Sequence, residues 1–391
     1  MKRFVKLLIK LLKWLLILFL LLNLAILISG KTYLYKGFMN TYMKGRVSAD
    51  IDEYRIFENR TVKAGAPDEW SFGRDFNTKV IPEKYFFDFE RMKTIAYLII
   101  QDDSLRFEKY WLGYSDTSHT SSFSMAKTFI GILAGIAIEE GKIQSLDQPV
   151  SDFLSEYHEG NKAKVTIRHL VTMCSGIDFD ESYVNPIGFA AEAYYGNDLR
   201  DLIFRYDAVK EPGKYFEYLS GNTQLLGFVL SKATGMTLSD YASEKLWKPI
   251  GAKSNAYWSL DHKDGDEKAY CCFNSNARDF ARVGQLFLDS GRWNGKQVVP
   301  EKYVLESFQP APISDGNASN NRYGYSWWLL PDYMGHNIFY ARGILGQYIV
   351  VVPDKKMIIV RLGRKREIEK GTGHPRDLSW YLDAGLELCK E

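Results

Sequence analysis

The chain has 391 residues, of which 46% are hydrophobic and 25% are charged, a composition typical of one or two globular domains. The formal net charge is only +2, and the basic residues are interspersed with acids, so no basic stripe indicates nucleic-acid binding. The six histidines and four cysteines show no C-x-x-C or H-E-x-x-H spacing, so we expect no metal and no cofactor.

The N-terminal segment is an apolar run from Trp14 to Ser29, extended by Leu11 and Leu12, and the residues before position 14 include five basic residues and no acid. This run is about long enough to span a bilayer. We expect residues 1–30 to be a signal anchor, with the basic leader in the cytoplasm and the body outside it, periplasmic or on the outer face of the membrane. A cleaved signal peptide is the alternative, and it would make the protein secreted.

Residues 31–90 are expected to form a juxtamembrane segment. We expect this segment to pack on a domain formed by residues 91–391. An apolar stretch over 94–100 and an alternating stretch over 105–111 predict an antiparallel hairpin. The next stretch, 121–141, has almost no polar face and ends in glycine, so it predicts a buried helix. The serines near its start are plausible N-caps.

The middle of the body, 142–290, is predicted to be mostly helical. Amphipathic patterns predict helices over 146–154, 166–173, 221–233 and 277–288. Thr166 is a good N-cap, and His169 is expected to be a core or capping residue. Cys271 and Cys272 are adjacent in the sequence and are expected to pack as small apolar residues, because neighbouring cysteines can hardly bridge without strain.

The C-terminal part returns to strands. Two β-branched arms around Pro353-Asp354 predict a hairpin over 348–362, and 377–388 reads as a closing helix. Strands at both ends of the body and helices between them predict an α+β fold, in which an antiparallel sheet built from both termini is flanked by helices and carries an inserted, mostly helical subdomain.

Three short motifs could carry chemistry. In the first, Ser124 and Lys127 lie three positions apart at a helix start, where a hydroxyl, an ammonium and free backbone N–H groups would meet. A serine nucleophile needs such a base and such donors, although a capping serine and a snorkelling lysine would give the same pattern.

The second motif runs from Pro212 to Thr223 and places Tyr218, Ser220 and Asn222 on alternate positions. A tyrosine near a lysine can transfer protons, but a turn with a surface tyrosine is the plainer interpretation. The third motif, Ala341–Tyr348, is bracketed by glycines and enters a strong strand. Its backbone could complete an oxyanion hole, or it could be a bulge required for packing.

In this order the motifs resemble the serine β-lactamase and penicillin-binding-protein superfamily, and most closely the class C-like branch that includes 6-aminohexanoate-dimer hydrolases and related esterases. Ser124-Met-Ala-Lys127 matches S-x-x-K, Tyr218-Leu-Ser220 matches Y-x-N in its Y-x-S form, and Gly343-Ile-Leu-Gly-Gln347 takes the place of K-T-G or H-x-G. The resemblance covers about residues 50–390 and implies a β-lactamase/transpeptidase-like fold.

The resemblance also implies roles for the site residues. Ser124 would be the acylated nucleophile, Lys127 its activating base and Tyr218 the proton carrier for the leaving group and for the deacylating water. The N–H groups of Ser124 and Gln347 would form the oxyanion hole. Substrate contacts are expected from the remaining motif residues, Ser220, Asn222, Gly343, Ile344 and Gly346.

Two departures from the family pattern bear on the substrate. Ile344 stands where a lysine or histidine would meet a penicillin carboxylate, and Ser220 replaces the usual asparagine. Both favour a small amide or ester substrate without that carboxylate. We therefore expect a membrane-anchored serine hydrolase. The alternatives are a penicillin-binding protein or β-lactamase proper, and a non-catalytic membrane-tethered binding protein. One further stretch, Lys370-Gly-Thr-Gly373, resembles K-T-G but is expected to be a loop.

Overall fold

The computed structural model describes residues 2–367 and 373–390, and it divides into two compact units. One unit comprises Met1–Ala49 with Asp180–Leu202, and the other comprises Asp50–Phe179 with Ile203–Glu391. Every residue predicted for the site belongs to the second unit. Of the stretch Lys370–Gly373, residues 370–372 lie outside the described residues.

The first unit consists of helices. Helix α1 (Lys2–Ile28) is long and apolar enough to cross a membrane, and none of its residues is buried. Helix α2 (Tyr33–Asn40) packs on α6 (Phe189–Tyr195), where a Cβ on Gly37 would lie 3.2 Å from the Tyr195 ring. Lys31 forms an ion pair with Glu192 at 3.7 Å.

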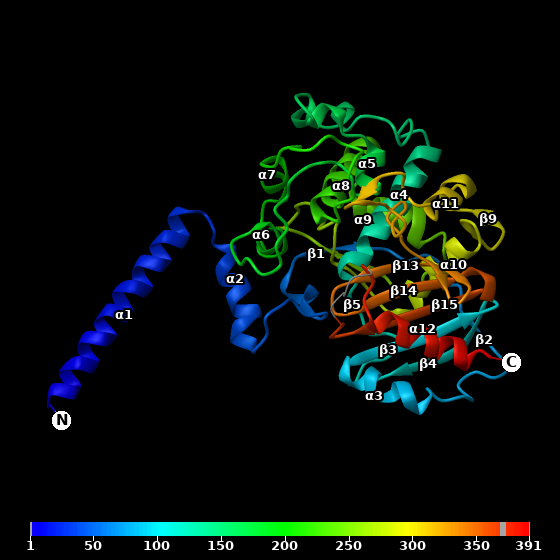
Figure 1. The fold of residues 1–391 in the computed structure, drawn as a ribbon, viewed down its shortest axis with the longest axis horizontal. Helices are drawn as coiled ribbons and strands as arrows, with labels where there is room; N and C mark the ends of the chain where they lie inside the picture. Colours follow the sequence, from blue (N-terminus) through cyan, green and yellow to red (C-terminus); the bar gives the residue numbers. More distant parts are fainter. Residues whose placement is uncertain (1, 368–372, 391) are drawn as a thin grey trace. The chain divides into compact units, whose positions relative to one another are not determined.

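The second unit is built on a seven-stranded sheet in the order β12-β13-β14-β15-β3-β4-β2 (Figure 1). Its strands are β2 (Ser71–Phe72), β3 (Thr94–Gln101), β4 (Ser104–Tyr110), β12 (Trp328–Tyr333), β13 (His336–Gly343), β14 (Gln347–Val352) and β15 (Met357–Gly363). All neighbours are antiparallel except β2 and β4. At the centre Leu98 pairs with Val360, so both predicted hairpins and the sheet from both ends are confirmed.

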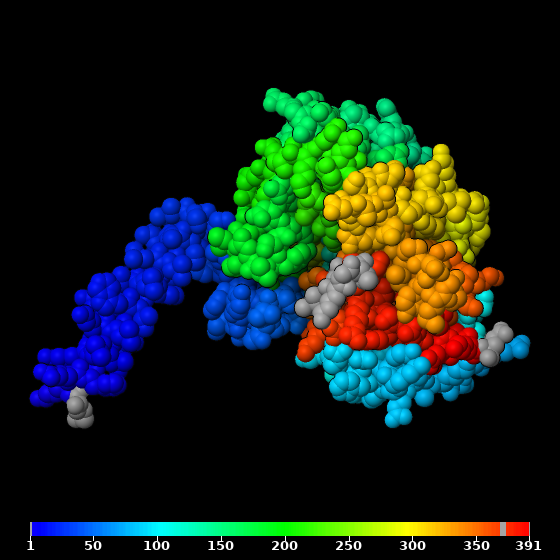
Figure 2. All heavy atoms as spheres, viewed as in Figure 1, coloured from blue at the N-terminus to red at the C-terminus, as the bar shows by residue number. Residues whose placement is uncertain are grey.

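Helices cover both faces of this sheet. Helix α10 (Ala277–Leu288) places Gly284 against Ile358, whereas α12 (Asp377–Leu388) places Gly385 against Ile359. Successive strand residues point to opposite faces, so α10 and α12 lie on opposite sides. Helix α3 (Glu83–Arg91) packs beside α12, and in Figure 2 the light blue of α3 lies next to the red of α12.

The mostly helical part is centred on α4 (Ala126–Glu139) and α8 (Ser220–Thr234), which pack on each other. The shorter helices are α5 (Ile167–Val171), α7 (Leu199–Phe204), α9 (Leu238–Ala242) and α11 (Glu301–Ser307). The capping prediction for α5 is confirmed, because Thr166 and His169 form a reciprocal capping box. The helix predicted over 146–154 is wrong: only a 3-10 turn forms at Val150–Asp152, because Pro149 interrupts the run.

A second sheet, not predicted from the sequence, runs in the order β1-β6-β7-β5. Its strands are β1 (Asn59–Val62), β5 (Thr120–Ser121), β6 (Ala256–Ser259) and β7 (Phe273–Ser275). Two small hairpins complete the strands: β8 (Arg292–Trp293) with β9 (Lys296–Gln297), and β10 (Ser314–Asp315) with β11 (Ala318–Ser319). Strands this short show no readable alternation.

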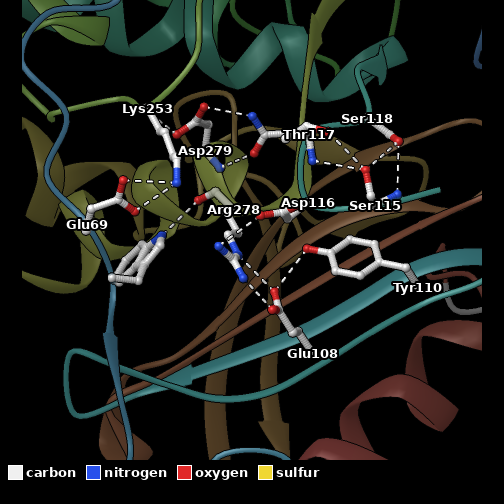
Figure 3. A network of polar contacts seen from close by, with 12 residues as sticks. Glu69, Glu108, Tyr110, Ser115, Asp116, Thr117, Ser118, Lys253, Arg278 and Asp279 are labelled. Atoms are coloured by element: carbon white, nitrogen blue, oxygen red, sulfur yellow. Dashed lines mark hydrogen bonds and ion pairs between the residues drawn. The ribbon is translucent and has the colours of Figure 1, made fainter.

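A polar network ties α10 to the edge of the main sheet (Figure 3). The Arg278 guanidinium pairs with Glu108 of β4 and with Asp116, the latter at 3.1 Å. Tyr110 donates to the same Glu108 at 3.1 Å, and Trp70 donates to the Arg278 carbonyl at 3.1 Å. The start of α10, which follows β7, is thereby fixed relative to the sheet.

Candidate active site

The turn that carries Ser124 is held from two sides before the helix begins. Strand β5 pairs with β7, and the Ser122 N–H donates to the Phe273 carbonyl at 2.9 Å. The chain then passes through Phe123, whose φ of 45° is left-handed, into a 3-10 turn, Phe123–Met125. Ser124 is half-buried between the buried Phe123 and Met125, so its position is set by its neighbours.

The start of α4 differs from the prediction in one respect. The N-cap of α4 is Met125, and no side chain caps it, so the serines are not caps of this helix. The 3-10 turn places Ser124 ahead of the first α-helical residue. The Ser124 hydroxyl is therefore not engaged as a cap of α4.

Lys127 lies in the first turn of α4 with only 1% of its surface exposed. Its Nζ donates to three oxygens: Ser124 Oγ at 3.1 Å, Ser220 Oγ at 3.0 Å and the Tyr270 carbonyl at 3.1 Å. The rings of Tyr218 and Tyr270 lie 5.2 Å and 5.6 Å from Nζ. A lysine held in this way is not snorkelling to solvent.

The second motif meets the first through α8. Ser220 is the first residue of α8, and its hydroxyl reaches Lys127 across the packed pair of helices. The Tyr218 ring, just before the helix, packs on Trp328 and Tyr323 with centroids 4.8 Å and 5.7 Å apart. Asn222, by contrast, is 1% exposed and donates to Met173 Sδ at 3.7 Å, on the packed side of the helix.

The third motif contacts the turn that carries Ser124 through its backbone. Gly343 ends β13 and pairs with Gln347 at the start of β14. A Cβ on Gly343 would lie 2.3 Å from the Ser122 carbonyl oxygen, so the two main chains are in direct contact. Only glycine allows this approach.

The loop between β13 and β14 is held by hydrogen bonds from the side chains of Gln347 and Arg361. The buried Gln347 amide donates to the carbonyls of Ile344 and Gly363 at 3.1 Å and 2.7 Å. Arg361 donates to the Gly346 carbonyl at 2.7 Å, and a Cβ on Gly346 would lie 2.0 Å from its guanidinium. Ile344 itself is half-buried.

A charged residue that was not singled out from the sequence lies beside Tyr218. The Arg342 guanidinium lies 3.4 Å from the Trp328 ring centroid and 5.8 Å from that of Tyr218. Arg342 also donates to the Gly373 carbonyl at 2.8 Å. The positively charged Arg342 thus lies near Tyr218. It stands one position before Gly343, a position that the motif pattern does not specify.

A histidine lies on the same wall. The Tyr340 hydroxyl and His374 Nδ1 are 2.7 Å apart. Burial, followed by the charges of Arg342 and Arg322, lowers the pKa of His374 to about 4. His374 is therefore neutral near pH 7.

Tyr270, Cys271 and Cys272 form a turn behind Lys127. The two cysteines form a disulfide and are 4% and 2% exposed. The expectation that they pack without bridging is wrong, because Cys272 adopts a left-handed φ of 65° that turns the two side chains toward each other. The Tyr270 carbonyl could not be found from the sequence, since any residue type supplies one.

The arrangement thus brings together Ser124, Lys127, Tyr218 and Ser220, with the Gly343–Gln347 hairpin beside the nucleophile turn. In the part of the chain that the structure describes, no group of three or more His, Cys, Asp or Glu could hold a metal ion. A hydroxyl, a buried amine and a phenol ring at one point are suited to nucleophilic acyl transfer.

Comparisons with known proteins agree with this geometry. The family model described as Beta-lactamase matches residues 84–376. The 6-aminohexanoate-dimer hydrolase of Paenarthrobacter ureafaciens is 26% identical over 316 residues, which cover 76% of this chain and 80% of that protein.

Solved structures show the same fold. A Bacillus anthracis protein named as a candidate 6-aminohexanoate-dimer hydrolase superposes with a TM-score of 0.73 at 22% identity, covering 86% of this chain and 92% of that one. A penicillin-binding protein from Bacillus halodurans has a TM-score of 0.59 at 19% identity, covering 78% of this chain and 99% of that one. The predicted α+β, β-lactamase/transpeptidase-like fold is confirmed, and the chain belongs to the Beta-lactamase family as a serine hydrolase.

Proposed function

We propose that this protein is a membrane-anchored, extracytoplasmic hydrolase that cleaves a small amide or ester through an acyl-enzyme on Ser124. The observation that carries the proposal is the buried Lys127 amine, 3.1 Å from Ser124 Oγ. A base within hydrogen-bond reach of a hydroxyl is the first requirement for a serine nucleophile.

For Lys127 to act as the base, its amine must be neutral when Ser124 attacks, and its contacts favour one orientation of that form. A neutral amine has two N–H donors and one lone pair, and the Tyr270 carbonyl can only accept. If the N–H groups point to Tyr270 and Ser220, the lone pair faces Ser124. Ser220 and Tyr270 therefore act as orienting groups for the base, as the third member of a catalytic triad does.

The reaction then follows in two halves. Ser124 Oγ bonds to the substrate carbonyl carbon while its proton passes to Lys127. The tetrahedral adduct collapses, the bond to nitrogen or oxygen breaks, and Tyr218 delivers the proton to the leaving amine or alcohol. Water then attacks the acyl-enzyme, releases the carboxylic acid and restores Ser124.

The developing oxyanion needs donors placed beside Ser124. We propose the backbone N–H groups of Ser124 and Gln347 for this role. The direct contact of Gly343 with the Ser122 carbonyl supports the proposal, because it holds the strand β13–β14 hairpin against the nucleophile turn. The buried side chain of Gln347 bonds to Gly363, which fixes the start of β14.

The proposed substrate class follows from the wall formed by the third motif. Ile344 is uncharged and half-buried, so it offers no cation for a substrate carboxylate. We propose that Ser220, Gly343, Ile344 and Gly346 contact the substrate. The contact predicted for Asn222 stays a prediction, and its burial against Met173 favours a supporting position behind that wall.

The proposed location rests on α1. Its length, its apolar composition and the basic residues at its start are those of a signal anchor. We expect the full-length protein to sediment with membranes and to need detergent for release. Deleting residues 2–28 should release active protein into the soluble fraction. Recovery of the full-length chain in the soluble fraction without detergent would contradict the anchor.

A fluorophosphonate probe followed by peptide mass mapping tests the chemistry. The expected adduct lies on Ser124, and Ser124→Ala should remove it while the neighbouring Ser122→Ala should retain it. Absence of an adduct in folded protein would overturn the hydrolase mechanism. Stable labelling by a fluorescent penicillin would instead favour a penicillin-binding protein.

A further inference from the structure

The Cys271–Cys272 disulfide lies between two main-chain groups that hold the catalytic residues. On one side, the carbonyl of Tyr270 accepts a hydrogen bond from Lys127 Nζ at 3.1 Å. On the other side, the carbonyl of Phe273 accepts from the Ser122 N–H at 2.9 Å, two residues before Ser124. The short turn between them therefore contacts both the base and the turn that carries Ser124.

The turn also accepts hydrogen bonds from residues of β6 and β7. Trp258 Nε1 donates to the Cys271 carbonyl at 3.2 Å, and the Ser259 N–H donates to the Cys272 carbonyl at 3.0 Å. The Asn274 amide donates to the same Cys272 carbonyl at 2.7 Å. These contacts fix both cysteine carbonyls, so the direction of the preceding Tyr270 carbonyl depends on the conformation at the two cysteines.

The conformation at Cys272 is one that a non-glycine residue rarely adopts. Its φ of 65° is left-handed, a conformation that is unfavourable for an L-residue because Cβ approaches the carbonyl oxygen. A disulfide between adjacent residues closes a small ring through the intervening peptide and keeps the chain in this state. With the bond broken, Cys272 can relax toward negative φ by giving up hydrogen bonds to its carbonyl.

We propose that the Cys271–Cys272 disulfide is a positioning element for Lys127, and that its reduction by a dithiol slows acylation of Ser124. The proposal rests on the function proposed above and adds redox control to the same site. In the reduction, the sulfur–sulfur bond breaks and each sulfur gains one electron and one proton. The dithiol supplies both electrons and both protons and becomes a disulfide itself.

This mechanism predicts different effects on kcat and on KM. The disulfide acts on Tyr270 and through it on the base, and it acts less directly, through Phe273 and Ser122, on the substrate-binding loop at Gly343–Gln347. Loss of the bond should therefore lower kcat for a small ester about tenfold, an effect typical of a base that is present but less well oriented, and leave KM nearly unchanged.

Three variants test the inference together with dithiothreitol treatment. Cys271→Ala with Cys272→Ala removes the disulfide and leaves an L-residue at the left-handed position. Cys271→Ala with Cys272→Gly also removes the disulfide but supplies a residue that adopts positive φ freely. Cys174→Ala with Cys389→Ala removes the two free thiols and keeps the disulfide.

The expected order is clear. The double-alanine variant at 271 and 272 should lose about tenfold in kcat, the alanine–glycine variant should recover most of it, and the Cys174/Cys389 variant should match wild type. Dithiothreitol should lower the wild-type rate reversibly and leave all variants without the disulfide unchanged. Alkylation after denaturation reports the thiols, two in oxidised and four in reduced wild type.

Two failures are distinguishable. If the oxidised wild-type enzyme takes no fluorophosphonate on Ser124, the proposed function is wrong. If it is labelled, but the reduced enzyme and the double-alanine variant are labelled equally fast, the positioning role of the disulfide is wrong. A drop in rate that glycine at 272 does not rescue would assign the disulfide to general stability and would also overturn the inference.

Discussion

Gly343 and Ser122 touch through their main chains: a Cβ on Gly343 would lie 2.3 Å from the Ser122 carbonyl oxygen. Since Ser122 belongs to the turn that carries Ser124, Gly343→Ala should displace the nucleophile relative to Lys127. A displacement of about 1 Å can cost about a hundredfold in rate, so we expect kcat/KM for p-nitrophenyl acetate to fall about that much.

The matched control for this change is Gly65→Ala. There the added Cβ would lie 3.2 Å from Cβ of Lys248, a contact that a small shift relieves. Activity of Gly65→Ala should stay near wild type. Full activity of folded Gly343→Ala would mean that the third motif does not govern the position of Ser124.

Replacing the buried base gives the second prediction. Lys127→Met keeps the length and apolar packing of the side chain but removes the amine, which contacts Ser124, Ser220 and the Tyr270 carbonyl. General-base catalysis contributes about 10² to 10⁴-fold, so ester hydrolysis should fall by that factor. The exposed Lys142→Met serves as the control, and equal activity of the two variants would exclude Lys127 as the base.

The third prediction concerns the substrate range set by Ile344. Introducing a cation with Ile344→Lys should raise the rate of labelling by a fluorescent penicillin about tenfold, because the lysine can meet the drug carboxylate. The uncharged Ile344→Met should not raise it. An unchanged penicillin rate in Ile344→Lys would show that residue 344 does not face the bound substrate.

The fourth prediction follows from His374, whose pKa is lowered to about 4 by burial and by Arg342 and Arg322. An unfolded chain binds this proton near pH 6.5, whereas the native protein binds it only near pH 4. Between these values the unfolded state holds more protons, so the free energy of unfolding must fall as the pH is lowered from 6.5 to 4. The loss attributable to His374 is on the order of 2 to 3 kcal/mol.

Urea unfolding of His374→Gln across this pH range should show a smaller loss of stability than wild type. His158→Gln is the control, since that exposed ring bonds the nearby Ser151 carbonyl at 2.9 Å. If both variants follow the wild-type curve, His374 is not held neutral by its surroundings.

The sequence was informative where its patterns are long. The strand over 94–100, the helix over 277–288 and the hairpin around Pro353-Asp354 were predicted nearly to their ends, because each has a sustained period. The sheet containing β5 and β7 was missed, since strands of two to four residues carry no period. That sheet nonetheless holds Ser122, two residues before Ser124.

The members of the candidate site that depend on side-chain identity could be proposed from the sequence. The motifs and the family resemblance that they carry point to Ser124, Lys127, Tyr218 and Ser220, which lie together in the structure. The Tyr270 carbonyl and the backbone of Gly343 act through main-chain atoms, which every residue possesses, so no residue letter reveals them. The bridge between Cys271 and Cys272 depends on a left-handed turn that the local sequence does not specify.

The pairing of β3 with β15 has a consequence for how the enzyme comes into being. These neighbours at the centre of the sheet come from opposite ends of the second unit, with the helical part synthesised between them. Such non-local pairing is slow to form and must wait for the end of the chain. The central sheet therefore cannot form until β15 has been synthesised, near the end of the chain, and Gly343 cannot take its place against the Ser122 carbonyl until strand β13 has emerged.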